Sequence, residues 1–113
     1  MKDRFSFIAL EEAKQFIESL DRKSRKKVMY NIWKTKSIND KELFKPVQGE
    51  IWEFRTLYKK KYIRIFAFWD KTDNQNTLVA ATHGIYKTTA KVLKSDLARA
   101  EKIRKEYYHS KNM

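Results

Sequence analysis

The segment 50–91 most constrains what this chain can fold into, because it holds three apolar runs separated by polar turns. In the first run Trp52 and Phe54 alternate with charged residues, which is the pattern of a strand with one buried face. The second run is rich in aromatic and β-branched residues, which suit a half-buried sheet surface. We therefore expect antiparallel strands over residues 50–55, 62–69 and 77–83, with turns at 59–61 and 70–76.

Strand alternation assigns these side chains to two faces of the sheet. If Trp52 and Phe54 face the core, Arg55 lies on the opposite face. In an antiparallel partner, residues 63, 65 and 67 would share the core face. The opposite face, together with the segment just past the third strand, would then carry Arg55, Tyr62, Arg64, Lys87 and Lys91. The sequence thus predicts a shallow basic surface on a small sheet.

Helical periodicity predicts two helices before this sheet and one after it. The first covers residues 9–20. The second covers about 22–36 with Asp21 as its N-cap, and we expect the two to form an antiparallel helical hairpin. Trp33 would belong to the apolar stripe of the second helix and lie in the core. The last helix would cover 94–109.

These elements give one α+β domain over residues 1–113, in the order α-α-β-β-β-α. An N-terminal helical hairpin would pack on a small twisted antiparallel sheet of three or more strands, closed by a C-terminal helix. The expected division is a hairpin and connector at 1–46, the sheet at 47–91 and the helix at 94–109. Trp69 is expected to pack in the sheet, although an aromatic ring there could also stack on a base.

Charge points to the class of partner. The 26 Lys and Arg residues against 14 acidic residues give a net charge of +12, which attracts polyanions such as nucleic acid, the ribosome or an acidic protein. The run 22–27 is basic at every position except Ser24, as expected of either a solvated helix face or a phosphate-contacting edge. The chain has no cysteine and no apolar run of about 20 residues, so we expect a soluble cytoplasmic protein.

Common catalytic motifs are absent from the sequence. It contains no Gly-rich phosphate loop and no metal-binding spacing, and we expect neither a metal nor a cofactor. We expect His83 to be a hydrogen-bonded strand-end residue and His109 to lie near a frayed terminus. A cluster of Arg, Lys and Tyr can still cleave RNA, because cations stabilise the charge that develops when the 2′-hydroxyl attacks phosphorus. Glu53, tuned by desolvation, is the candidate general base.

Three motifs in order carry a family resemblance: Trp-Glu-Phe-Arg at 52–55, Arg-Ile-Phe-Ala-Phe at 64–68, and the run from His83 to Lys91. Together they resemble the core pattern of the RelE/ParE toxin superfamily, most closely its phage-derived HigB-like branch, over roughly residues 47–108. The pattern departs from that branch at Ile85, at Thr88, at 92–93, and at the spacing of Tyr62 from Arg64.

The resemblance implies a RelE-like fold and the toxin of a type II toxin–antitoxin system. Such a toxin is a metal-independent, ribosome-dependent mRNA endonuclease that inhibits translation and arrests growth. A cognate antitoxin, expected to be of the helix-turn-helix type, would neutralise it and bring the complex to operator DNA. By resemblance, phosphate binding and transition-state stabilisation fall to Arg55, Arg64 and Lys87, with Lys91 as a secondary candidate.

For RNA binding we expect contributions from Lys59, Lys60, Lys61, Tyr62, Arg25 and Lys26. Two alternatives remain open at the level of the sequence. One is a non-catalytic module that binds RNA or a partner through the same surface. The other is a ParE-like gyrase poison, which shares the fold, although the cationic cluster on the sheet favours RNA cleavage.

Overall fold

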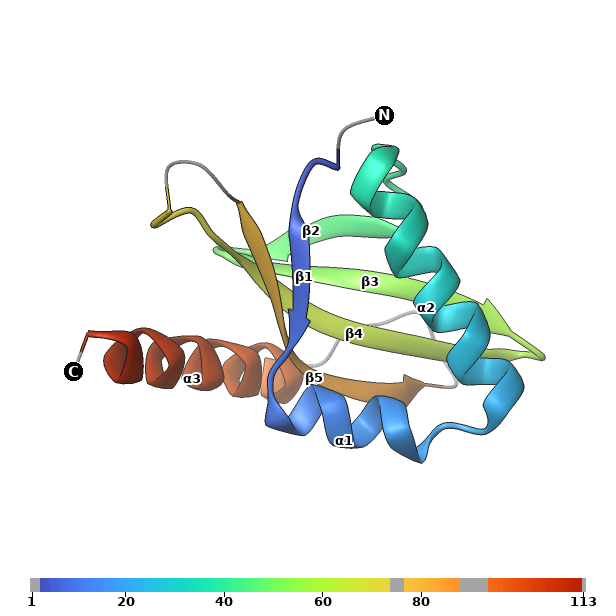
Figure 1. Ribbon diagram of the computed structural model, residues 1–113. Coiled ribbons are helices and arrows are strands. Elements are labelled where there is room, and N and C mark those ends of the chain that lie inside the picture. The colour runs from blue at the N-terminus through green and yellow to red at the C-terminus, as the bar shows by residue number, and fades with distance from the viewer. Residues whose placement is uncertain (1–2, 74–76, 88–93, 113) are drawn as a thin grey trace.

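The computed structural model describes residues 3–73, 77–87 and 94–112. Within these ranges no helix is both long and apolar enough to cross a membrane. The elements, labelled in Figure 1, are β1 (Ser6–Ala9), α1 (Glu11–Ser19), α2 (Arg22–Ser37), β2 (Phe44–Gln48), β3 (Ile51–Tyr58), β4 (Lys61–Asp70), β5 (Leu78–Lys87) and α3 (Lys94–Lys111).

The α+β class is confirmed, and the sheet has five strands in the order β1-β5-β4-β3-β2. The three predicted strands are its centre, β3, β4 and β5, paired antiparallel. Two edge strands were not predicted. β1 has four residues and pairs parallel to β5, whereas β2 pairs antiparallel to β3 and contains Pro46, which an edge strand tolerates.

The predicted assignment of the two sheet faces is confirmed by the register of β3 and β4. Phe54 is opposite Ile65, and both are buried in the larger core cluster. Arg55 is opposite Arg64 on the other face of the sheet. The alternation of side chains along these two strands therefore fixes which residues can meet at a functional site.

The two N-terminal helices cover the core face, each packed on the sheet, α1 mainly on β5 and α2 on β3. Asp21 caps α2 as predicted, since its carboxylate accepts a hydrogen bond from the backbone N–H of Ser24 at 3.1 Å. Nδ2 of the buried Asn31 donates to Oγ1 of Thr56 at 3.0 Å. That bond ties α2 to the end of β3 where the basic residues lie.

The C-terminal helix α3 covers the opposite face of the sheet, and its N-terminal part lies beside α1 (Figure 1). Its Ala100 and Leu97 pack on Phe66 in a second, smaller core. At its far end, the buried Asp70 accepts hydrogen bonds from Oη of Tyr107 at 2.5 Å and from Nζ of Lys111 at 2.6 Å. Helix α3 therefore covers the part of this sheet face near Asp70. The part of the face next to the β3–β4 turn lies beyond α3.

Trp33 corrects the sequence prediction of a core position, because its side chain is 64% exposed. The buried stripe of α2 is formed by Ser24, Val28, Asn31, Ile32 and Thr35, and part of it is polar. The buried stripe of α2 is therefore rotated by part of a turn from the stripe that its apolar residues alone predict. Phe54 is buried as predicted, and Trp52 and Trp69 pack half-buried against the core.

Gly84 is required by the packing of α1. A Cβ at this position would overlap the ring of Phe16, which lies directly over the β5 backbone. Gly84→Ala should lower the free energy of unfolding by about 1–3 kcal/mol, because the ring or the helix must move. Urea denaturation would measure the change.

A double-mutant cycle provides the control for this prediction. In a Phe16→Ala background the added methyl has room, so most of the cost of Gly84→Ala should disappear. An equal cost in both backgrounds would show that Phe16 is not the obstacle.

Candidate active site

Two arginines and a glutamate form an ion cluster in the β3–β4 hairpin. Glu53 lies two residues before Arg55 on the same face of β3, and Arg55 is opposite Arg64. Nη1 of Arg64 donates a hydrogen bond to Oε1 of Glu53 at 2.5 Å. Nε of Arg55 lies 3.6 Å from the same oxygen. One carboxylate therefore faces two guanidinium groups, and positive charge remains in excess.

The two arginines differ in access to solvent. The side chain of Arg55 is 29% exposed, whereas that of Arg64 is 2% exposed. The Arg64 guanidinium also lies 5.8 Å from the centre of the Tyr62 ring. A phosphate arriving from solvent would therefore meet Arg55 directly, with Arg64 contributing positive charge from beneath.

Glu53, the candidate general base, lies inside the sheet between its cationic neighbours. It is buried, and its Oε1 is held by the two arginines. Its Oε2 has no hydrogen-bond partner among the residues that the structure describes. Because a buried carboxylate requires a cationic partner, the geometry gives Glu53 the task of orienting and neutralising Arg64.

A groove of about 570 Å³ lies beside this cluster. β2 pairs with β3 as far as Phe54, and beyond that point α2 and residues 40–43 flank the edge of β3. The lining residues are Lys27, Tyr30, Asn31, Lys34, Asp40, Glu42, Leu43, Arg55, Thr56, Leu57, Tyr62 and Arg64. The groove thus joins the arginine pair of the sheet to one side of α2.

Cationic side chains outnumber acidic ones in this lining, four to two. The two acids lie on the 40–43 segment, and Asp40 is 3.9 Å from the ammonium of Lys34. Arg25 and Lys26, predicted to bind RNA, are exposed on α2 and do not line the groove. The residues of α2 that do so are Lys27, Tyr30, Asn31 and Lys34, whose spacing of three and four positions defines one helical stripe.

The predicted turn between β3 and β4 is confirmed at Lys59 and Lys60, which both have positive φ, 49° and 66°. Two consecutive residues in this region match a tight hairpin turn, where Asn or Gly is the usual choice. Lys61 begins β4 and is exposed, and Tyr62 lines the groove. The turn therefore presents the exposed Lys59 and Lys60 between two strands whose Leu57 and Tyr62 line the groove, whereas the Lys61 ammonium lies 5.8 Å from the centre of the Tyr86 ring on β5.

Lys60→Gly should raise the free energy of unfolding by about 0.5–1 kcal/mol, because glycine adopts positive φ without a Cβ clash. The urea midpoint would measure it. The matched control is Lys61→Gly, which places glycine within β4 and should destabilise the protein. Loss of stability in both variants would contradict the strain assigned to Lys60.

Lys87 lies on the same face as the arginines, opposite Tyr62 in the β4–β5 register. Its side chain is 7% exposed, and its ammonium lies 3.2 Å from the carboxylate of Asp96 in the first turn of α3. Lys87 therefore shares the predicted surface but is engaged with α3. Lys91 and Thr88 lie outside the described residues.

The whole assembly of hairpin, groove and covering helices can be compared with known protein families. A family model described as "Phage derived protein Gp49-like (DUF891)" matches residues 15–105, from within α1 to within α3. This chain belongs to the Gp49-like family. That family falls within the RelE/HigB-like toxin group. A comparison with individually curated proteins finds no significant match.

In this Gp49-like chain the two histidines lie outside the groove lining. His83 is buried under α3, stacked on Phe66 at 4.9 Å, with Nδ1 3.2 Å from Oγ1 of Thr82. Burial, and secondarily the charge of Arg99, lower the pKa of His83 to about 4. His109 is exposed in the last turn of α3. Among the described residues, no three His, Asp or Glu side chains converge in a group that could hold a metal ion.

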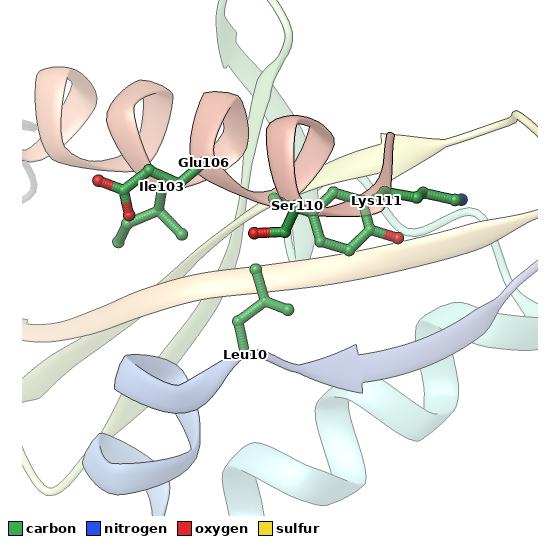
Figure 2. A pocket seen from close by; sticks show the side chains of 6 residues that line it. Leu10, Ile103, Glu106, Ser110 and Lys111 are labelled. Carbon is green, nitrogen blue, oxygen red and sulfur yellow. The ribbon is translucent and has the colours of Figure 1, made fainter. Parts of the chain in front are cut away.

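A second pocket of this Gp49-like domain, of about 550 Å³, lies between α3 and the residue that links β1 to α1 (Figure 2). Figure 2 shows Leu10 pointing towards α3. The lining residues are Leu10, Ile103, Glu106, Tyr107, Ser110 and Lys111. Among the described residues that line this pocket, the one cation is Lys111, whose ammonium donates a hydrogen bond to Asp70, so these residues lack the convergent cations of the groove.

Proposed function

We propose that this protein is the toxin of a type II toxin–antitoxin pair and cuts mRNA on the ribosome without a metal ion. The observation that carries the proposal is the Arg55–Glu53–Arg64 cluster beside a cationic groove, in a chain of the Gp49-like family. The partly exposed guanidinium of Arg55 matches the oxygens of a phosphate that gains charge during cleavage, and the buried guanidinium of Arg64 adds positive charge behind it.

In the proposed reaction the RNA 2′-hydroxyl gives its proton to solvent and its oxygen bonds to the adjacent phosphorus. The bond from phosphorus to the 5′-oxygen breaks, and the 5′-oxygen takes up a proton from water, which leaves a 2′,3′-cyclic phosphate and a 5′-hydroxyl. Arg55 binds the phosphate oxygens and stabilises the charge that builds on them, because its side chain reaches solvent. Arg64, held by Glu53, positions the site and strengthens its positive field. Lys87 and Lys91 are proposed as further cations, and Lys59, Lys60 and Lys61 as contacts to flanking phosphates.

A toxin that cuts mRNA must be silenced while its host cell grows. We propose a cognate antitoxin, of the helix-turn-helix type, as the partner that silences the toxin and brings the complex to operator DNA. Positive charge along the groove favours an acidic antitoxin segment as its cover.

Induced expression in a bacterial host, with growth curves and mapping of mRNA 5′ ends, tests this function. The wild type should arrest growth and cut translated mRNA, whereas Arg55→Ala should do neither. The control is Arg99→Ala, which removes an exposed arginine paired with Glu12 on another part of the molecule. Arrest without mRNA cleavage would contradict the proposal and point to a gyrase poison. No arrest from folded protein would point to a binding module.

A further inference from the structure

The outer face of α2 carries two large aromatic side chains that remain open to solvent. Trp33 is 64% exposed and Tyr30 is 52% exposed. Their ring centroids are 6.1 Å apart, with 37° between the planes. Side chains of this size are mostly buried in folded domains, so an exposed pair on one helix is a candidate contact surface.

Positive charge surrounds this aromatic pair. The 16 residues of α2 include no Asp or Glu, and its cations are Arg22, Lys23, Arg25, Lys26, Lys27, Lys34 and Lys36. The ammonium of Lys27 lies 5.5 Å from the centre of the Tyr30 ring. Flat rings next to cations complement a ligand that itself has flat rings and negative charge, which describes single-stranded nucleic acid.

The aromatic pair is continuous with the groove. Tyr30, Lys27 and Lys34 line it together with Arg55. Trp33 lies three positions after Tyr30, on the adjoining part of the helix surface. A strand whose phosphate rests at Arg55 could therefore continue past the lysines and onto the two rings. An acidic protein segment would satisfy the lysines but would leave the rings without stacking partners.

We propose that the outer face of α2 is a stacking platform for RNA next to the cleaved phosphate. Trp33 and Tyr30 stack on adjacent bases, and Lys27 and Lys34 bind phosphates between these bases and Arg55. This inference rests on the proposed function, because RNA is taken as the substrate, but it does not require cleavage to be observed.

Fluorescence anisotropy of a labelled 2′-O-methyl oligonucleotide of about 12 nucleotides tests the platform. This probe lacks the 2′-hydroxyl nucleophile and cannot be cut by the proposed reaction. Trp33→Ala and Tyr30→Ala should each weaken binding by about fivefold or more, as expected for loss of one stacked base. Trp33→Phe keeps a ring and should bind close to wild type.

The matched control is Ile38→Ala, which removes a 49% exposed apolar side chain at the end of the same helix and should leave binding unchanged. Because the substituted side chains are exposed, circular dichroism and the urea midpoint should match those of the wild type. Quenching of tryptophan fluorescence by the probe should also largely disappear in Trp33→Phe, since Trp52 and Trp69 are half-buried.

Wild-type affinity in both alanine variants would overturn the platform and assign the face to a protein partner. Quenching that persists in Trp33→Phe would overturn it as well. Binding that depends on Trp33 in a protein that cuts no mRNA would support the platform while contradicting the proposed function. The two proposals can therefore fail independently.

Discussion

Glu53→Ala should lower the free energy of unfolding by about 3–5 kcal/mol, as expected when one partner of a buried ion pair is removed. The carboxylate is 1% exposed and is the partner of Arg64, whose side chain is 2% exposed. Its removal takes away the carboxylate that faces this buried guanidinium, and loss of one partner of a buried ion pair is costly. Chemical denaturation of the purified variant would measure the change.

A double substitution separates stability from function at this cluster. Glu53→Leu with Arg64→Met replaces both charges by apolar side chains, which is often neutral or stabilising for a buried ion pair. The double variant should therefore recover most of the stability that Glu53→Ala loses, yet cut no mRNA. If Glu53→Ala cost less than about 1 kcal/mol, as for a surface ion pair, the cluster would be solvated and not a buried anchor of the site.

A second large effect is expected from acid. His83 is neutral in the folded protein down to about pH 4, whereas in the unfolded chain it gains a proton near pH 6.5. The unfolded state therefore binds more protons than the folded state between these values, so stability falls as the pH is lowered. The shift from 6.5 to about 4 corresponds to a loss of up to about 3 kcal/mol, complete near pH 4.

His83→Gln should flatten the stability curve between pH 6.5 and 4.5. The charged groups that act on His83 are Arg99, Asp96 and Glu12. Burial would raise the pKa of Asp70, but hydrogen bonds from Lys111, Tyr107 and Thr72 hold it below the ordinary value of 3.8. Its stabilisation is therefore lost at lower pH than that of His83. An unchanged slope in the variant would show that His83 is not the titrating group.

The sequence pattern was sufficient to predict the three central strands of the sheet. Period-two alternation located β3 to β5 and placed Arg55 and Arg64 on one face, as the register confirms. The two edge strands, β1 and β2, were not predicted, for different reasons. β1 is only four residues long, and β2 contains Pro46 in a stretch that otherwise resembles a connector.

The candidate site was predicted only in part, because partners are set by tertiary packing. Alternation showed that Glu53 and Arg64 share a face, but not that burial would make them an ion pair. The apolar pattern predicts Trp33 in the core, whereas the polar residues Asn31 and Thr35 occupy the buried positions of α2 instead. Because the buried stripe of α2 is rotated by part of a turn from the predicted one, Lys27 and Lys34 face the groove.

The most direct measurement is the rate at which purified protein cuts mRNA bound to programmed ribosomes, for wild type and Arg55→Ala. Arg55 is partly exposed, and its removal leaves the Glu53–Arg64 pair in place, so the variant should fold. The proposed function predicts cleavage by the wild type and by Arg99→Ala, and a loss of about 100-fold or more in Arg55→Ala, comparable to removal of one transition-state donor. Wild-type cleavage by Arg55→Ala would contradict the central role given to the arginine cluster.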